Sequence, residues 1–332
     1  MELDDLRLVR ALQLAPRASF ARLAEVVGVH ERTAARRYRR LRRAGIVRIF
    51  GMVNPMAVGY QFWQVRVRCR PDASESLATA LAARDDIAWV AVTAAGSEVS
   101  FSVRSLSAER RDLLLTRLLP RSAQVLDIEA AVVLHIFRGL SSRGWSSFGG
   151  ALTAEEITLL TAEEVAEGEA APIPLEPCDS AFFGVLAADG RATTAQLAEA
   201  AGISEGRAAR RLAVLRQSRT LIIDLDLAHE VFGITVGAQI YFAVTPARLH
   251  EVGEALARLP EVGFAAALSG RHNLMASVAC RDLSHLYAFM TADAGTLDAI
   301  VSMEVVPLAR MVKQSGGLIA DGRLVDPGTA RD

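Results

Sequence analysis

The chain has 332 residues, of which 51% are hydrophobic and 23% charged, and its formal net charge is −1. This length indicates two or more domains of ordinary globular composition, and the near-neutral total excludes a chain-wide attraction to polyanions. The apolar runs are too short for a membrane-spanning helix. The cysteines have no paired spacing and the charged N-terminus does not resemble a signal peptide, so we expect a cytoplasmic protein without disulfides.

The chain contains an internal repeat. Residues 21–47 recur as residues 195–221, and twelve of these 27 positions are identical at a shift of 174 residues. The same shift carries Gly59 onto Gly233. A period this long indicates a duplicated pair of domains, because solenoid repeats are much shorter.

Each copy begins with a segment of helical periodicity. In copy one, Leu6, Val9 and Leu12 share one helical face, and a short helix around Leu23–Val27 follows. After a turn at Gly28, a third helix is predicted from Glu31 to about Ala44, before Gly45. This is the order of a helix-turn-helix unit. We place these two heads at residues 1–50 and 177–225.

The second part of each copy alternates strands and helices. Residues 63–69 show the two-residue alternation of a half-buried strand, and helical and strand patterns follow in the order βαββαβ. The last strands are predicted near residues 132–136 and 300–306. We place these ferredoxin-like domains, called tails here, at residues 60–138 and 234–315. The predicted fold class is α+β: two copies of a winged or three-helix head plus a ferredoxin-like βαββαβ domain.

The remaining segments have a different composition. Residues 139–176 contain seven Glu and one Arg, which indicates an acidic linker. A short helix is predicted within it after a cap at Thr153, and a cluster of prolines ends the segment. Residues 316–332 are predicted to be a frayed tail.

The two heads differ in charge. Residues 1–50 hold twelve Arg and five acidic residues, whereas residues 177–226 hold six of each. The third helix of head one has no acid after Glu31, and an arginine row of this density favours a polyanionic partner. A solvated arginine-rich face is the alternative. We predict double-stranded DNA as the partner, with contacts from one set of residues in the major groove or on the nearby backbone: Arg32, Thr33, Arg36, Arg37, Arg40, Arg43 and Arg48.

The third helix of head two lacks most of these charges. Gly206 stands in place of Arg32, and Val214 in place of Arg40. An outward valine indicates a covered surface, so head two is predicted to bind DNA weakly or to act as a packing module. Weak docking on a second half-site stays open.

The tails carry no catalytic constellation. The six histidines are scattered without metal-ligand spacing, so we predict no metal, no cofactor and no enzymatic activity. The turns at Gly96 and Gly270 each lie between two strands. Glycine permits an unusual backbone and the close approach of a ligand there, and a plain hairpin turn is the alternative.

The chain resembles the Lrp/AsnC (feast/famine) family of transcriptional regulators, in the less common tandem form. The resemblance rests on the heads, on Leu41, Gly45 and Ile46 at the end of the third helix, and on Asn54–Pro55 and Gly59 before the first tail strand. It covers residues 1–138 and 177–315. It implies sequence-specific DNA binding, an amino acid or other small molecule as effector, and a homo-oligomer formed through the tails.

The resemblance also implies the position of the effector. The family loop often contains Gly-x-Tyr-Asp, and here both loops lack the Asp. The corresponding residues are Gly96, Ser97, Glu98, Gly270, Arg271, His272 and Asn273. In single-unit members two tails pair across a two-fold axis, so we expect the two tails of this chain to pair with each other.

Siroheme decarboxylases, built from the same units, are the alternative from another class. Their pattern has an Arg-Arg-Phe-Gly-Ala run followed by a histidine at the junction of head and tail. Here the junction reads Arg48-Ile49-Phe50-Gly51, and the next histidine is His135. A scaffold whose tails bind a partner protein is a third possibility.

Overall fold

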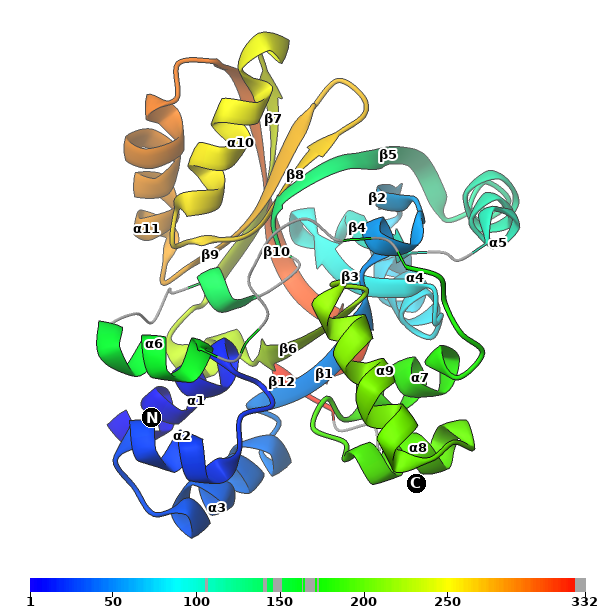
Figure 1. The fold of residues 1–332 in the computed structure, drawn as a ribbon. Helices are drawn as coiled ribbons and strands as arrows, with labels where there is room; N and C mark the ends of the chain where they lie inside the picture. The colour runs from blue at the N-terminus through cyan, green and yellow to red at the C-terminus, as the bar shows by residue number, and fades with distance from the viewer. Residues whose placement is uncertain are drawn as a thin grey trace.

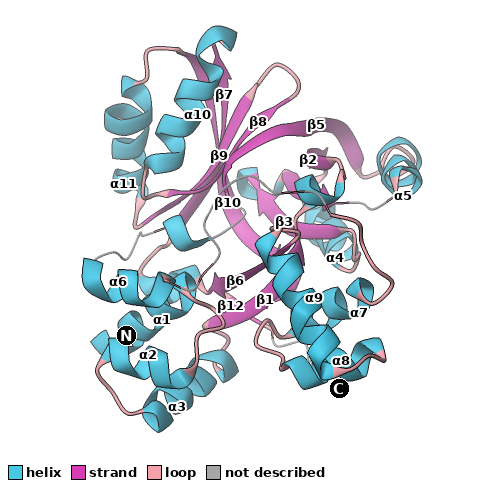
Figure 2. Ribbon diagram, in the orientation of Figure 1, coloured by secondary structure: helices cyan, strands magenta, loops and turns pink. Residues whose placement is uncertain are grey.

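The structure is a computed structural model that describes residues 1–104, 107–139, 142–145, 151–162, 164, 171 and 173–325. It shows two head-and-tail units, with both heads at one end of the molecule and both tails at the other (Figure 1). Helices and strands mix in each unit (Figure 2), so the predicted α+β class is confirmed.

Head one consists of α1 (Leu3–Leu14), α2 (Phe20–Val27), α3 (Glu31–Arg43) and the strand β1 (Val47–Val53). Local sequence sets these limits. The Ser19 side chain accepts a hydrogen bond from the backbone of Arg22 and caps α2, and Gly28 ends α2 in the left-handed conformation at φ 77°. His30 precedes α3 and makes no side-chain cap.

Head two repeats this order with α7 (Asp179–Ala188), α8 (Thr194–Ala201), α9 (Glu205–Gln217) and β6 (Leu221–Leu227). Thr193 and Gln196 form a reciprocal capping box on α8, and Ser204 caps α9. The limits of the second and third helices correspond in the two heads at the shift seen in the sequence, whereas α7 begins two residues later than the shifted start of α1.

Tail one has the order β2 (Phe62–Cys69), α4 (Ser74–Ala82), β3 (Ile87–Thr93), β4 (Glu98–Arg104), α5 (Ala108–Leu113) and β5 (Val125–Arg138). Tail two has β7 (Val236–Val244), α10 (Leu249–Arg258), β8 (Val262–Leu268), β9 (Leu274–Cys280), α11 (Leu283–Ala288) and β10 (Ile300–Gln314). This is the expected βαββαβ order.

The two tails join through their last strands. β5 pairs with β2 and then with β8 of the other tail, and β10 pairs with β7 and then with β3. In the described part of the chain, the strands close into a ring in the order β10-β3-β4-β2-β5-β8-β9-β7. The two last strands are therefore much longer than predicted, because each serves both tails. A small core that includes Phe62, Tyr241 and Met275 lies where the tails meet.

The heads also pair with each other. β1 and β6 form an antiparallel ladder in which Val47 faces Leu227 and Val53 faces Leu221. Val47 and Leu221 are repeat counterparts, as are Val53 and Leu227, so the ladder is symmetric about its central pair. The chain is therefore a pseudo-dimer with a pseudo-two-fold axis.

Two segments differ from the prediction. The described part of the acidic linker includes α6 (Ala154–Thr161), which starts at the predicted Thr153 cap. Trp145, Leu152 and Leu160 join the core of head one, so this part of the linker belongs to that head. The predicted frayed tail instead contains β11 (Gly317–Ala320) and β12 (Arg323–Leu324), which extend β10 as a hairpin.

Candidate nucleic-acid interface and ligand pocket

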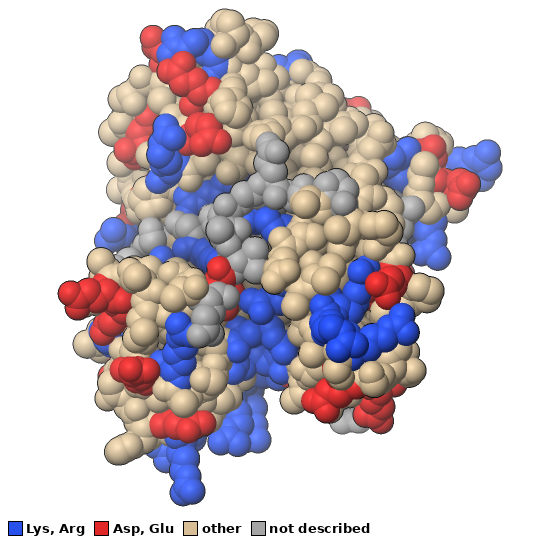
Figure 3. All heavy atoms as spheres, viewed as in Figure 1, with Lys and Arg blue, Asp and Glu red and all other residues tan. Residues whose placement is uncertain are grey.

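The exposed side of α3 carries a row of arginines. Residues three, four and seven apart lie on one face of a helix. The helix has one acidic residue, Glu31, in its first turn. Lys and Arg atoms gather along the lower edge of the lobe that head one forms (Figure 3). The exposed members, called the arginine row here, are Arg32, Arg36, Arg39, Arg40 and Arg43.

Arg37 is placed differently from the row. Its side chain is 18% exposed and forms ion pairs with Asp4 and Asp5 of α1, at 3.0 and 2.9 Å, and with Glu2 just before that helix, at 2.6 Å. The hydrogen bonds that this guanidinium donates to Glu2 and Asp5 raise its pKa. Arg37 therefore ties α3 to α1. Arg40 also contacts Asp5 at 2.5 Å but stays 57% exposed.

Arg48 does not lie on the surface, contrary to the expectation that it reaches the DNA backbone. Its side chain is 5% exposed and pairs with Asp226 of β6 at 2.6 Å. It also donates hydrogen bonds to the carbonyls of Gln314 and Ser315. Strand alternation explains the difference, because Arg48 points from β1 toward β10 and away from the arginine row. Thr33 is half-buried.

Head two presents a weaker charge on α9. Arg211 pairs with Asp179 at 2.6 Å, which repeats the Asp5–Arg37 contact of head one. Arg207 pairs with Glu176 at 3.2 Å. Val214 is 41% exposed, so the prediction that it lies on a covered surface is wrong for the chain by itself.

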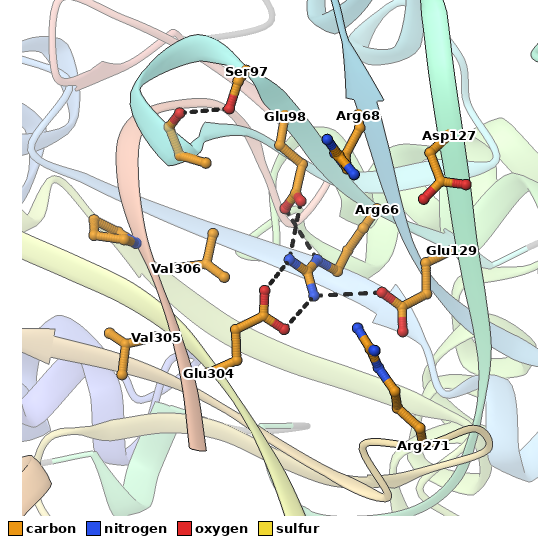
Figure 4. Close-up of a pocket in the computed structure, with 12 residues that line it drawn as sticks. Arg66, Arg68, Ser97, Glu98, Asp127, Glu129, Arg271, Glu304, Val305 and Val306 are labelled. Carbon is orange, nitrogen blue, oxygen red and sulfur yellow. Dashed lines mark hydrogen bonds and ion pairs between the residues drawn. The ribbon is translucent and has the colours of Figure 1, made fainter. Parts of the chain in front are cut away.

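A pocket of about 380 Å³ lies between the two tails (Figure 4). Strands β2, β4 and β5 of tail one line it, together with β10 and the turn after β8 from tail two. Its charged lining residues are Arg66, Arg68, Glu98, Asp127, Glu129, Arg271 and Glu304.

Arg66 holds the two tails together in this pocket. Its guanidinium donates to both oxygens of Glu98, at 3.1 and 3.0 Å, and to both oxygens of Glu304, at 3.0 and 2.8 Å. It also lies 4.4 Å from the ring centre of Tyr241. Burial lowers the pKa of Arg66, but the hydrogen bonds to Glu304 and Glu98 outweigh it and raise that pKa overall. Arg66 in turn lowers the pKa of Glu304.

The expected effector residues divide into three groups. Ser97, Glu98 and Arg271 line the pocket, and Gly96 and Gly270 turn beside it at φ 91° and 102°. The other two lie outside its lining: His272 Nδ1 is 3.8 Å from Glu304, and Asn273 hydrogen-bonds both backbone groups of Val244.

Arg66 and Glu304 are pocket residues that the sequence alone does not predict. Arg66 falls on the polar side of the alternating pattern in residues 63–69, which by itself predicts a solvated side chain. The available signal was the pairing of tails expected from the duplication, which turns part of that polar face toward the other copy.

Neither a metal site nor a membrane span is found in the described residues. There, His, Cys, Asp and Glu do not gather in groups of three or more that could bind a metal ion. Among the described helices, none has both the length and the apolar character needed to cross a membrane.

The fold and the arginine row together define the chain as a helix-turn-helix protein with two ferredoxin-like domains that enclose a pocket. Residues 3–42 match the AsnC-type helix-turn-helix domain, and residues 235–318 match the Lrp/AsnC ligand binding domain. The chain therefore carries an AsnC-type helix-turn-helix domain and an Lrp/AsnC ligand binding domain, in a tandem-duplicated arrangement.

Curated relatives correspond to less than half of this chain. An uncharacterised HTH-type transcriptional regulator from Pyrococcus abyssi is 27% identical over 147 residues, which are 42% of this chain and 90% of the relative. One from Pyrococcus horikoshii is 26% identical over 148 residues, again 42% of this chain and 90% of the relative. Such a relative has the length of one head-and-tail unit.

Solved structures show the tandem fold itself. The crystal structure of the siroheme decarboxylase NirDL has a TM-score of 0.62 at 15% identity and covers 94% of this chain and 92% of its own. Escherichia coli AsnC, at 22% identity, covers 42% of this chain and 94% of its own, with a TM-score of 0.38.

Proposed function

We propose that this protein is a sequence-specific DNA-binding transcriptional regulator. The observation that carries the proposal is the arginine row. It is exposed on α3, which is the second helix of the helix-turn-helix pair α2–α3 within the AsnC-type domain. Such a helix enters the major groove, where arginine binds guanine edges and phosphates. A regulator of transcription acts where the DNA is, so we assign it to the cytoplasm.

Within this proposal, α3 provides the contacts. Arg32, Arg36, Arg40 and Arg43 project toward the DNA, with Thr33 beside the first of them. Arg37 contributes by fixing α3 on α1 through Asp5. Arg39 is exposed in the same row and joins the proposed set.

A salt series tests the DNA proposal. Binding of the purified protein to the DNA upstream of its own gene, followed by fluorescence anisotropy, should weaken steeply as salt rises. Arg36→Ala with Arg43→Ala should lower the affinity by about 10- to 100-fold and reduce the salt slope by about two. Arg258→Ala is the control, because Arg258 is an exposed arginine on α10 of tail two. An unchanged slope in the α3 variant would refute the docking.

The pocket between the tails is the proposed effector site. Arg68 and Arg271 supply positive charge beside the carboxylates of Asp127 and Glu129, so the lining suits a small molecule with both charges, such as an amino acid. Calorimetric titration with the common amino acids tests this. Arg271→Ala should abolish any heat of binding, and Arg248→Ala, an exposed arginine in the same tail, should not.

We also propose a homo-oligomer. The family forms oligomers through tails, and each added chain would bring one further arginine row. Sedimentation at several concentrations tests this, and a monomer at all of them would contradict it.

The tandem fold supports a second candidate, a siroheme decarboxylase-like enzyme. The support is the match to NirDL over 94% of the chain, which concerns the fold alone at 15% identity. The residues argue against it. Arg48 is engaged by Asp226, and His229 lies against the Trp145 ring at 5.0 Å, where burial lowers the pKa of His229 to about 4. Addition of siroheme with no change in its absorption would dismiss this candidate.

A further inference from the structure

The two heads are held in one fixed relation. Each strand of the β1–β6 ladder contributes seven residues, and the central pair is Phe50 with Asp224. A ladder of this length allows little sliding, because a shift by one residue would turn buried side chains to the opposite face. Both strands are almost wholly buried.

A reciprocal pair of arginines adds to this lock. Arg17 of head one donates to the carbonyls of Gly190 and Ala192 in head two, at 2.6 and 3.0 Å. Arg191, the repeat counterpart of Arg17, donates to the carbonyls of Pro16 and Ala18 in head one, at 2.6 and 2.7 Å. This is the self-complementary contact of a two-fold interface, made here within one chain.

The backbones of the two heads also approach each other closely at two glycines. A Cβ atom added at Gly51 of β1 would lie 2.7 Å from Cβ of Leu186 in α7. One added at Gly190 would lie 2.8 Å from the backbone nitrogen of Phe50. Head two is therefore packed closely against β1, which favours a constant spacing of α3 and α9.

The locked heads nevertheless present different surfaces. The positions of α9 that correspond to the arginine row are all exposed, but only one of them is an arginine. They are Gly206, Arg210, Ala213, Val214 and Gln217. Head two therefore keeps the position of a DNA-reading helix and has lost most of its charge and hydrogen-bonding groups.

We infer that one chain binds an asymmetric DNA site. Head one reads base edges in one half-site, and head two lies on the sugar–phosphate backbone of the neighbouring half-site, with Arg210 as its main contact. The inference rests on the proposed function. Base contacts specify sequence, whereas phosphate contacts fix the position of the protein. In dimeric helix-turn-helix proteins the two half-sites lie about one helical turn apart, and we expect the same spacing here.

Selection from a randomised duplex library that spans about three helical turns tests this inference. The full-length protein should enrich a motif with sequence information on one side only. A duplex that carries the enriched motif should bind in a ratio of one duplex per chain, as measured by titration well above Kd, whether or not the chains associate with one another. Hydroxyl-radical footprinting should show backbone protection on both sides of the motif, including the side without sequence preference.

Matched variants separate the two heads. Arg36→Ala should lower affinity for the motif by about 10-fold or more and abolish its preference over random DNA. Arg210→Ala, at the corresponding position of head two, should lower affinity for both DNAs equally, by about two- to three-fold, and reduce the salt slope by about one. The pair Ala213→Arg and Val214→Arg should raise affinity and steepen the slope, because it restores to α9 the charges at Arg39 and Arg40.

The outcomes distinguish this inference from the proposed function. A palindromic motif that binds two chains, or an Arg210→Ala variant with unchanged affinity and salt slope, would overturn the asymmetric site and leave the regulator proposal standing. Absence of any enriched motif together with salt-insensitive binding would overturn both.

Discussion

Arg48 and Asp226 form a buried ion pair between the two heads, with 2.6 Å between Nη2 of the arginine and Oδ2 of the aspartate. They face each other in the β1–β6 ladder. The same guanidinium donates to the carbonyls of Gln314 and Ser315 at the end of β10. In its first half, β10 carries Glu304, which lines the pocket between the tails. One strand therefore connects the proposed effector site to the ladder that fixes the heads.

Removal of either member of this pair should be costly. Arg48→Ala leaves the carboxylate of Asp226 buried without its partner, and we expect the free energy of unfolding to fall by about 3–5 kcal/mol. Asp226→Ala should cost a similar amount. The double variant Arg48→Met with Asp226→Leu should cost clearly less than the sum, because no charge stays buried. Urea unfolding measures all three, and strictly additive costs would contradict the coupling.

Asp224 should make stability depend on pH. It accepts hydrogen bonds from the backbone and hydroxyl of Ser142, at 2.8 and 2.5 Å, but burial raises its pKa to about 6. Its pKa in the unfolded chain is about 3.9. The folded state thus binds more protons between these values, so stability falls as pH rises from about 4 to about 6. The full loss is about 2–3 kcal/mol and is present above pH 6.

Asp224→Asn removes this titration and keeps a hydrogen-bonding side chain at the site. Its stability relative to the unchanged protein should therefore rise by about 2–3 kcal/mol between pH 3.5 and pH 7. Burial also raises the pKa of Asp226, and the two carboxylates repel each other, so the difference reports Asp224 together with its effect on Asp226. Plots of the free energy of unfolding against pH that run parallel for the two proteins would contradict the assignment of this titration to Asp224.

Local signals were enough to predict the elements. The helices of both heads follow apolar periodicity and end at glycines such as Gly28 and Gly202, and α6 begins at its Thr153 cap. The extent of β5 and β10 could not be predicted in this way. Their outer halves pair with strands of the other copy, and no turn or change of composition marks the residue at which the partner changes.

The site was predicted only in part for a similar reason. The arginine row follows from helical spacing, which is local. The partners of Arg37, Arg48 and Arg66 lie between 32 and 267 residues away along the chain, so no local pattern indicates that these side chains are engaged. A charged residue on the polar face of a strand predicts solvent exposure unless the opposing sheet is known, which is why Arg66 was missed.

Substitution of two glycines in head one should show whether the C-terminal hairpin packs against that head. Gly45 and Gly28 both adopt positive φ, at 63° and 77°. A Cβ atom at Gly45 would lie 2.6 Å from the carbonyl oxygen of Leu324, whereas no described atom lies within 4 Å of one at Gly28. Gly28→Ala should therefore cost about 1 kcal/mol for the left-handed backbone alone, and Gly45→Ala clearly more. Thermal unfolding of both variants measures the difference, and equal costs would show that β12 does not contact Gly45 in solution.

Arg66→Lys should weaken the connection between the tails although it preserves the charge. A lysine ammonium cannot provide the two-sided fork that binds both Glu98 and Glu304, and it stacks less well on Tyr241. Glu98 is 4% exposed and would lose part of its hydrogen bonding, so we expect a loss of about 1–3 kcal/mol in the free energy of unfolding. Arg70→Lys is the control, because Arg70 pairs with Asp72 on the surface, and it should change stability by less than about 0.5 kcal/mol. Equal stability of the two variants would mean that the fork in the pocket contributes no more than a surface ion pair.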